Sequence, residues 1–452
     1  MEPQPAIGVP RNGPAVDAGG IVLIVVTICV FLLPILIYFP PMLPSKSEAL
    51  LQTHTPIGLT ATPRSRSFLS VFGRRRVRAV SGDSSEHPTG AAQIRNLCIY
   101  PVKSCKGIEV TESKVLPAGL EFDRLFMFAQ LRSPFPVSLD TPEDEKSRHI
   151  WDFVTQRQFP LLATVSVDLF VPDVAKAAVS NGDDNAYLIL RFPWVESGVV
   201  GALAWLVAKL SRGWRALPEK EVLLPVMFPP QDEIAARGYT YEQVTIWRET
   251  VTALNMETEL PRELRLYLGV SNRLGIFRVD PARLRDVYRC APTGAEAGYQ
   301  PCTGFQDAYP LHLLNLSSVR DLEAKLEKDD DLRQLDPGRF RANIIIDGPG
   351  AYEEETWKKI VLRPVPRTKS VHATQPCQFH VSCRTVRCKM PNVDQETGHR
   401  HPVEPDRSLR KFRDVDPGAK KKGCLGMQLT PLFDLGKKPK KAVTCVDSVL
   451  LV

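Results

Sequence analysis

Short signatures for nucleotide and redox cofactors are missing from this sequence. It contains no GxGxxG fingerprint, no phosphate-binding P-loop and no internal repeat, so it has no nucleotide site of a familiar kind. Neither a Cys-x4-Cys-x2-Cys iron–sulfur run nor a flavin or haem signature occurs. If the protein carries out redox chemistry, its electrons must therefore come from another protein.

Cysteine is sparse, with 10 residues in a chain of 452, and the spacings lack the dense pattern of a disulfide framework. We therefore expect mostly reduced thiols. The net charge of +7 is concentrated in basic runs at 64–78, 420–422 and 437–441. No aromatic residues alternate with these runs, which argues against a nucleic-acid partner. Solvated surface is the simplest interpretation, and an anionic partner or lipid surface is the alternative.

A single long apolar run, IVLIVVTICVFLLPILIY, occupies residues 21–38. As a helix it would be about 27 Å long, just enough to cross a membrane. Arg11 is the only cation before it and the arginines follow it, which favours a transmembrane anchor over a cleaved signal peptide. The same asymmetry predicts a cytosolic globular part. We expect an N-terminal tail at 1–20 and a disordered tether at 39–93, rich in Ser, Thr, Pro and Arg.

A second apolar stretch, VVGALAWLVAKL at 199–210, is too short to span a membrane. Lys, Arg and Trp lie at its end and immediately after it. The pattern predicts an amphipathic or buried helix, with contact to a membrane surface as the alternative.

From Ile94 the sequence changes to short β-rich runs separated by Gly, Pro and Asp. Such runs predict a mainly β, α+β fold with barrel-like sheets and inserted helices. The clearest helix follows Asn315, where Ser318 and Asp321 have the spacing of a capping box. The predicted strands lie at 94–100, 109–116, 124–130, 161–170, 186–192, 342–348 and 449–452.

One candidate anion site lies in YPVKSCKG, at 100–107. Lys103 and Ser104 stand between two predicted strands, and Arg124 ends the turn that follows the second strand. A lysine supplies a point charge, a serine and backbone amides supply directed donors, and an arginine supplies a fork that suits phosphate. On residue type alone, a surface loop with two cations is the more common interpretation.

A second candidate lies in GRFRANIIIDG, at 338–348, where Arg341 and Asn343 come immediately before a buried strand. Arg341 should have a fixed acceptor, which could be an anion or simply one of the glutamates at 353–355. The polar segment 305–318 leads into a helix N-terminus, where anions also bind readily.

The stretch 372–401 holds three cysteines and four histidines. No Cys-x2-Cys pair occurs, so a structural zinc site is the weaker alternative. Arg387 and Lys389 flank Cys388, and Arg384 precedes it. These cations would stabilise a thiolate and make Cys388 a better ligand for a soft metal. An inert reduced cysteine is the other interpretation.

Together and in this order, these segments resemble the MOSC proteins, particularly the mitochondrial amidoxime-reducing component family of molybdenum enzymes. The resemblance extends over residues 94–452 and rests on YPVKSCKG, TQRQFP, FQDAYPLHLL, RFRANI, YEEETW and RCKMPNVDQETG. It implies an N-terminal MOSC β-barrel-like domain at 94–270, with a helical insert near 199–212. A MOSC β-barrel domain at 271–452 would follow.

The resemblance also implies a molybdenum cofactor, Mo-molybdopterin, held by its pterin dithiolene and one protein cysteine. Cys388 aligns with that cysteine, as the catalytic metal ligand. The residues that align with the family's pterin and phosphate contacts are Lys103, Ser104, Arg124, Arg341 and Asn343. The family reduces N-oxygenated substrates such as amidoximes and hydroxylamines. Its electron donors are cytochrome b5 and the NADH-dependent reductase of that cytochrome, and its membrane is the mitochondrial outer membrane, with endoplasmic reticulum as the alternative here.

The chain departs from the family pattern at Ala342, where Pro is usual, and in the spacing of Cys383 from Cys388. The segment 247–249 reads Trp-Arg-Glu instead of Trp-Gly-Asp. The natural substrate is therefore not predicted. A second hypothesis is a cofactor-binding or sulfur-handling protein, similar to the MOSC module that follows a cysteine desulfurase, although nothing here resembles the pyridoxal-phosphate domain of such enzymes. A third is a cysteine-rich scaffold that binds zinc.

Overall fold

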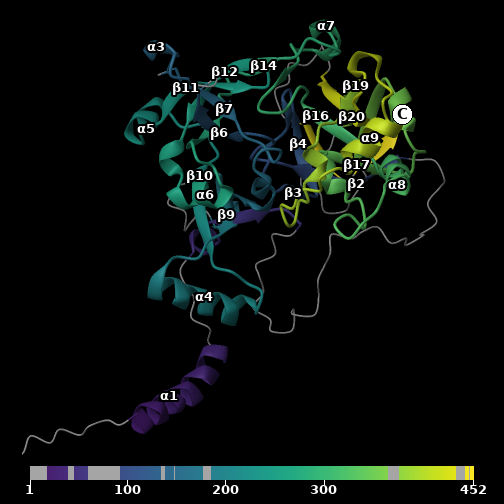
Figure 1. Cartoon of the computed structure of the whole chain (residues 1–452). Helices are drawn as coiled ribbons and strands as arrows, with labels where there is room; N and C mark the ends of the chain where they lie inside the picture. The colour runs from purple at the N-terminus through teal and green to yellow at the C-terminus, as the bar shows by residue number, and fades with distance from the viewer. Residues whose placement is uncertain are drawn as a thin grey trace, which may run out of the picture. The chain divides into compact units, whose positions relative to one another are not determined.

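The computed structural model describes residues 18–38, 45–59, 92–133, 138–146, 148–176, 185–364, 376–433, 443–446 and 448–451. The chain divides into two compact units, which are described separately. The smaller unit contains α1 (Ala18–Tyr38) and α4 (Gly198–Arg212), and the larger unit contains the other described elements (Figure 1). The predicted residues 1–17 of the tail and lysines of the run at 437–441 lie outside the described residues.

Helix α1 covers the predicted membrane anchor. Its described side chains end at Leu32, and the apolar ones from Ile21 onwards are exposed. No helix in the described part of the chain is long and apolar enough to cross a membrane. The structure therefore does not support the transmembrane prediction for 21–38.

Five strands of the larger unit form a closed barrel in the order β11-β12-β13-β6-β7. Successive side chains of β6 point to opposite faces of the strand, and each face is buried in a different core. Met127 and Ala129 point into the barrel core, whereas Phe126 and Phe128 belong to the main core of the unit. Because both faces of β6 are buried, the strand reads as a continuous apolar run. The barrel strands are β6 (Phe126–Arg132), β7 (Ile150–Phe153), β11 (Thr240–Ile246), β12 (Glu249–Asn255) and β13 (Arg273–Arg278).

A four-stranded antiparallel sheet has the order β1-β8-β9-β10. Its edge strand β1 lies inside the predicted tether, so that prediction was wrong for residues 45–59. Helix α2 precedes β1, and Ser47 donates from Oγ to Glu221 of β10 at 2.7 Å. These elements are α2 (Lys46–Leu50), β1 (His54–Ile57), β8 (Ser166–Pro172), β9 (Tyr187–Pro193) and β10 (Glu219–Pro225). The predicted strand at 161–170 begins only at Ser166, because Pro160–Thr164 forms a 3₁₀ turn.

The largest sheet has the order β17-β16-β20-β19-β18-β22-β2-β3, and β2 pairs with β17 as well. Strand β2, near residue 95, thus pairs with strands that come after residue 340 in the sequence. In addition, β13 belongs to the barrel but lies beyond residue 270. The secondary-structure pairing therefore crosses the predicted boundary at 270/271. The strands are β2 (Ala92–Ile99), β3 (Ile108–Val110), β16 (Leu311–Asn315), β17 (Ile344–Asp347), β18 (Lys359–Pro364), β19 (Cys377–Val386), β20 (Cys424–Leu432) and β22 (Ser448–Leu451).

Short elements fill the periphery of the larger unit. They are α3 (Glu143–Lys146), α5 (Gln231–Ala236), α6 (Arg262–Leu268), α7 (Gly294–Ala297), α8 (Leu316–Ala324), α9 (Asp406–Phe412), β4 (Glu112–Leu116), β5 (Gly119–Leu120), β14 (Arg285–Asp286), β15 (Cys302–Thr303) and β21 (Val443–Val446). The predicted helix after Asn315 is confirmed as α8, but its cap is Asn315, whose side chain accepts from the Ser317 amide. Ser318 instead donates to Glu354 at 2.7 Å, so the capping-box prediction was wrong.

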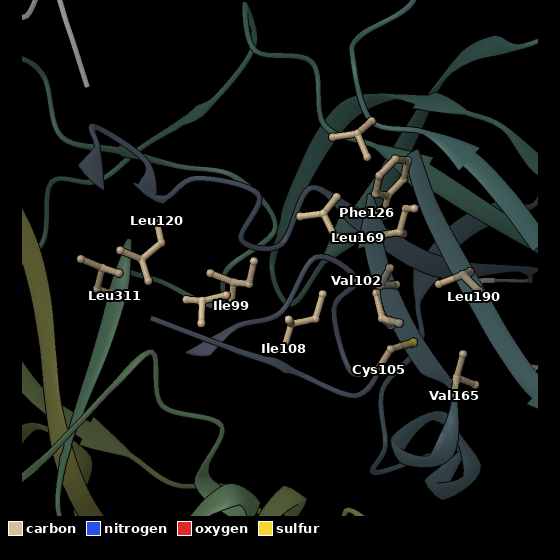
Figure 2. Close-up of a cluster of buried hydrophobic side chains, with 14 of the residues drawn as sticks. Ile99, Val102, Cys105, Ile108, Leu120, Phe126, Val165, Leu169, Leu190 and Leu311 are labelled. Carbon is tan, nitrogen blue, oxygen red and sulfur yellow. The ribbon is translucent and has the colours of Figure 1, made fainter. Parts of the chain in front are cut away.

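The main core holds the loop between β2 and β3 in place. Figure 2 shows Ile99, Leu120 and Leu311 grouped together, with Val102 and Cys105 nearer Phe126, Leu169 and Leu190. Val102 and Cys105 are fully buried, and they flank Lys103 and Ser104. The core thus fixes the backbone of the predicted anion-binding loop.

Candidate functional site

Lys103 lies at the centre of a buried polar cluster. Its Nζ donates to the Phe305 carbonyl at 2.7 Å and to Asp307 Oδ1 at 2.5 Å. Burial lowers the pKa of Lys103, and Asp307 opposes that effect. Burial would raise the pKa of Asp307, but Lys103, Trp247 and Arg124 together hold it well below its usual value. Each of the two groups therefore favours the charged form of the other.

Two predicted arginines meet over the ring of Tyr100. The guanidinium carbons of Arg124 and Arg341 lie 4.6 and 4.3 Å from the ring centroid. Arg124 donates from Nη1 to Asp123 at 2.6 Å and to Asn343 at 3.1 Å, and from Nη2 to the Arg341 carbonyl. Asn343 is thus the bridge between strand β17 and the turn after β5. Arg341 does not pair with the glutamates at 353–355, which was the ordinary interpretation of this residue.

Two glutamines complete the network and were not predicted. Gln156 donates from Nε2 to the Ser104 carbonyl at 2.8 Å and exchanges reciprocal amide hydrogen bonds with Gln395, at 3.0 and 2.9 Å. Gln395 also accepts from Arg341 Nη1 at 3.2 Å. Their signal in the sequence was indirect, because they lie in the TQRQFP and PNVDQETG segments. The pair links the loop of Ser104 to Arg341.

Several residues of this network have a left-handed backbone. The φ angles are 69° at Ser104, 50° at Arg124, 53° at Arg341 and 59° at Trp247. Such a conformation costs about 1–3 kcal/mol at a residue other than glycine and persists only where surrounding contacts impose it. Strain of this kind concentrates at binding sites and active sites. Its occurrence at three of the five predicted cofactor contacts therefore supports a binding role.

Cys388 follows β19 and is a half-buried free thiol. Its neighbour Arg387 donates from Nη2 to the Phe340 carbonyl at 2.9 Å. Burial lowers the pKa of Arg387, while Cys388 and Asp307 act in the opposite direction. Arg384 instead pairs with Glu355 at 2.7 Å. Of the cations predicted to stabilise the thiolate, Arg387 therefore faces the cluster and Arg384 is engaged elsewhere.

The site has unsatisfied donors and an excess of positive charge. Among the described residues, buried atoms without a hydrogen-bond partner include Arg341 Nη2, Arg387 Nε and His312 Nε2. Burial, Arg387 and Arg124 hold the pKa of His312 well below its usual value, so this histidine is neutral. The nearby carboxylates of Asp123 and Asp307 are outnumbered by the cations Lys103, Arg124, Arg341 and Arg387. Buried charges need partners, so the donor set fits an anionic group such as a phosphorylated cofactor.

The hypothesis of a zinc-binding scaffold is not supported by a set of metal ligands among the described residues. In the ranges that the structure describes, no group of three or more His, Cys, Asp or Glu side chains is placed to hold a metal ion. Cys383 and Cys388 are free, and Cys377 is disulfide-bonded. Among the described residues, eight cysteines are free, as expected of mostly reduced thiols: Cys29, Cys98, Cys105, Cys290, Cys302, Cys383, Cys388 and Cys424.

Comparison with known protein families finds two matching domain models, one in the N-terminal and one in the C-terminal part of the chain. Residues 91–193 match the MOSC N-terminal beta barrel domain, and residues 302–435 match the MOSC domain. The chain is a MOSC-domain protein. More particularly, it is distantly related, over most of its length, to the mitochondrial amidoxime reducing components, which confirms the resemblance seen in the motifs.

The relatives share modest identity. Mitochondrial amidoxime reducing component 2 of Rattus norvegicus is 23% identical over 351 residues, which cover 76% of this chain and 77% of the relative. The Bos taurus protein of the same name is 25% identical over 349 residues, with 77% of each covered. Molybdenum cofactor sulfurase of Drosophila pseudoobscura pseudoobscura is 30% identical over 405 residues, which cover 85% of this chain but 40% of the sulfurase.

Proposed function

We propose that the protein is a molybdenum-cofactor-dependent reductase that removes oxygen from N-oxygenated substrates. The observation that carries this proposal is the buried cationic cluster, with unsatisfied donors on Arg341 and Arg387, beside the free thiol of Cys388. A structural ion-pair network would satisfy its donors internally. The excess of positive charge and the unpaired donors of this cluster instead fit an anionic ligand.

Different residues of the cluster would bind different parts of the cofactor. Lys103, Arg124 and Arg341 would neutralise its phosphate, and Asn343 fixes the orientation of Arg124 by accepting its hydrogen bond at 3.1 Å. Cys388 would be the protein's thiolate ligand to the metal, because a soft thiolate suits a soft metal centre. When bound, the cofactor supplies a two-electron redox centre with affinity for oxygen. Overall, the reduction consumes two electrons and two protons and releases water.

Trp247 marks the proposed approach of the substrate. Its ring is 43% exposed, lies 5.3 Å from Phe153, and is covered by the Arg157 guanidinium at 4.2 Å. Its indole N–H donates to Asp307 at 3.2 Å, which ties this aromatic surface to Lys103. A planar amidoxime could stack on this surface while its polar end reaches the cluster.

The proposed electron donors are cytochrome b5 and its NADH-dependent reductase. The chain lacks redox signatures of its own, so a protein donor is required. We propose the basic segment 437–441 as a docking face for an acidic cytochrome. Replacing its lysines with glutamine should remove the salt dependence of electron transfer, and an unchanged salt dependence would reject this face.

The test of the function is metal and turnover analysis of the full-length protein, produced in cells that make the cofactor. We expect near-stoichiometric molybdenum and pterin, and reduction of an amidoxime with a chemical electron donor. Cys388→Ala should abolish turnover while circular dichroism and pterin content persist. Cys290→Ala, at an exposed free thiol, is the matched control and should remain active. Full activity of Cys388→Ala would reject its role as metal ligand.

A second candidate function is cofactor binding or sulfur handling without reduction, as the 30% identity to a molybdenum cofactor sulfurase permits. It predicts bound pterin or a persulfide on Cys388, but no amidoxime reduction by any donor. The same purified protein therefore distinguishes the two functions.

A further inference from the structure

Helix α4 turns a stripe of large apolar side chains to solvent. Val199 is 77% exposed, Val200 71% and Leu203 58%, and Leu206 is also exposed. Spacings of four and three residues place Val199, Leu203 and Leu206 on one side of the helix. The helix is therefore amphipathic, and the expectation of a buried helix does not hold for this face.

The opposite side of α4 is made of small residues. Gly201 and Ala208 are the buried residues of the helix, and they lie seven positions apart along the chain. A Cβ at Gly201 would lie 1.6 Å from the carbonyl oxygen of Glu196, so only glycine allows that segment to pack here. The side of α4 that carries Gly201 and Ala208 is thus the buried one, and the apolar stripe is exposed.

The charged residues of α4 and its C-terminal flank have one sign. Residues 197–218 contain Lys209, Arg212 and Arg215 but no Asp or Glu. Lys209 Nζ lies 5.2 Å from the ring centroid of Trp205 and 5.9 Å from that of Trp214, which is 80% exposed. Tryptophan and basic side chains gather at the level of lipid headgroups, where an apolar body and a polar tip are both accommodated.

The length of α4 determines how it could meet a membrane. Its 15 residues extend to about 22 Å, too short for a bilayer core of about 30 Å. We propose that α4 lies in the plane of an anionic lipid surface. The stripe of Val199, Val200, Leu203 and Leu206 enters the acyl boundary, and Lys209, Arg212 and Arg215 contact the headgroups. Charge complementarity selects an anionic surface over a second copy of the chain, which would present the same three cations.

The test measures amide hydrogen exchange across 198–217 in the full-length protein, with and without vesicles. This readout is local, so binding by any other segment does not obscure it. Vesicles of phosphatidylcholine with a fifth of phosphatidylserine should slow exchange in α4 at least tenfold, and pure phosphatidylcholine should slow it less. Leu203→Glu should abolish the slowing. Leu266→Glu, at an exposed leucine of α6, is the matched control and should leave it intact.

Charge removal gives a second, independent measurement. Each of Lys209→Gln, Arg212→Gln and Arg215→Gln should weaken partitioning of the α4 segment to anionic vesicles by about fivefold. Absence of any vesicle-dependent slowing in the wild type would overturn the proposal. So would protection that depends on protein concentration without lipid, since that result would assign the stripe to a second copy. Neither result bears on the reductase activity, so the two proposals fail separately.

Discussion

Arg341 offers a test in which stability and cofactor retention should respond differently to one substitution. Burial lowers the pKa of Arg341 from 12.5 to about 10, which corresponds to a cost of about 3 kcal/mol for keeping it charged. Its hydrogen bond to Gln395 returns about 1.5–3 kcal/mol. The two effects nearly cancel. Arg341→Gln should therefore change the unfolding free energy of the cofactor-free protein by no more than about 1 kcal/mol.

Cofactor retention should fall at the same time. A charge-assisted hydrogen bond to phosphate is worth about 1.5–3 kcal/mol, which is roughly a 10- to 150-fold loss of affinity. Urea unfolding of cofactor-free protein measures the stability, and pterin fluorescence after gel filtration measures retention. Glutamine is unbranched at Cβ, so the left-handed backbone at this position is no more strained than with arginine.

The matched control is Arg339, which is also buried and lies two residues earlier. It donates to the carbonyls of Pro391 and Asn392 and to Asp394 at 2.8 Å, so the protein supplies three acceptors, although its Nε has no partner. Arg339→Gln should cost the cofactor-free protein about 2–4 kcal/mol. An equal loss of stability in Arg341→Gln would show that Arg341 is structural and would refute the reasoning.

Three further predictions concern the surroundings of the site. The pKa of Asp307 is lower in the folded than in the unfolded state, so its stabilisation is fully present above about pH 4 and is lost progressively as the pH falls towards the depressed folded-state pKa. Asp307→Asn should cost about 1–2 kcal/mol at pH 7 and less at each lower pH, and a cost in urea unfolding that grows as the pH falls from 7 to 2 would contradict this account. Trp247→Ala should raise KM for an amidoxime about fivefold or more with a smaller change in kcat, because about 1 kcal/mol of stacking is lost, whereas Trp214→Ala should leave steady-state kinetics unchanged. Removal of residues 1–44 should leave thermal unfolding of the larger unit unchanged. Removal of 1–59 also deletes α2 and β1 and should lower Tm by several degrees, and equal Tm values would show that these two elements contribute nothing.

The sequence was informative where a pattern is local. Strands β2, β9 and β17 were predicted within two residues, since apolar runs bounded by turn residues are the direct signal of a buried strand. The cap of α8 was not predicted, because Asn315 and Ser318 are both good capping residues and only the buried contact of Ser318 with Glu354 decides between them. The strand β1 was missed because four residues inside a polar segment carry almost no periodicity.

The candidate site was only partly accessible from the sequence. Lys103, Arg124, Arg341 and Asn343 were grouped through the order of their segments, and the structure brings them together. The pairing of Gln156 with Gln395 joins residues that are 239 positions apart, and neutral amides give no charge signal. The left-handed backbone of Ser104 and Arg124 was also not predictable, since neither residue type favours that conformation.

Because β2 pairs with β17, the largest sheet cannot form until the chain has been synthesised beyond residue 347. Leu97 leaves the ribosome long before its partner Ile344 is made, and at ~5–20 residues per second the delay is roughly 12–50 s. During that time β2 presents an unpaired edge, which is a hazard for aggregation. The barrel strands β6 to β13 are all complete by residue 278 and can close first. The nascent protein should therefore depend on chaperones until its last strands emerge, and a fragment ending near residue 300 should bind its C-terminal remainder in trans through this edge.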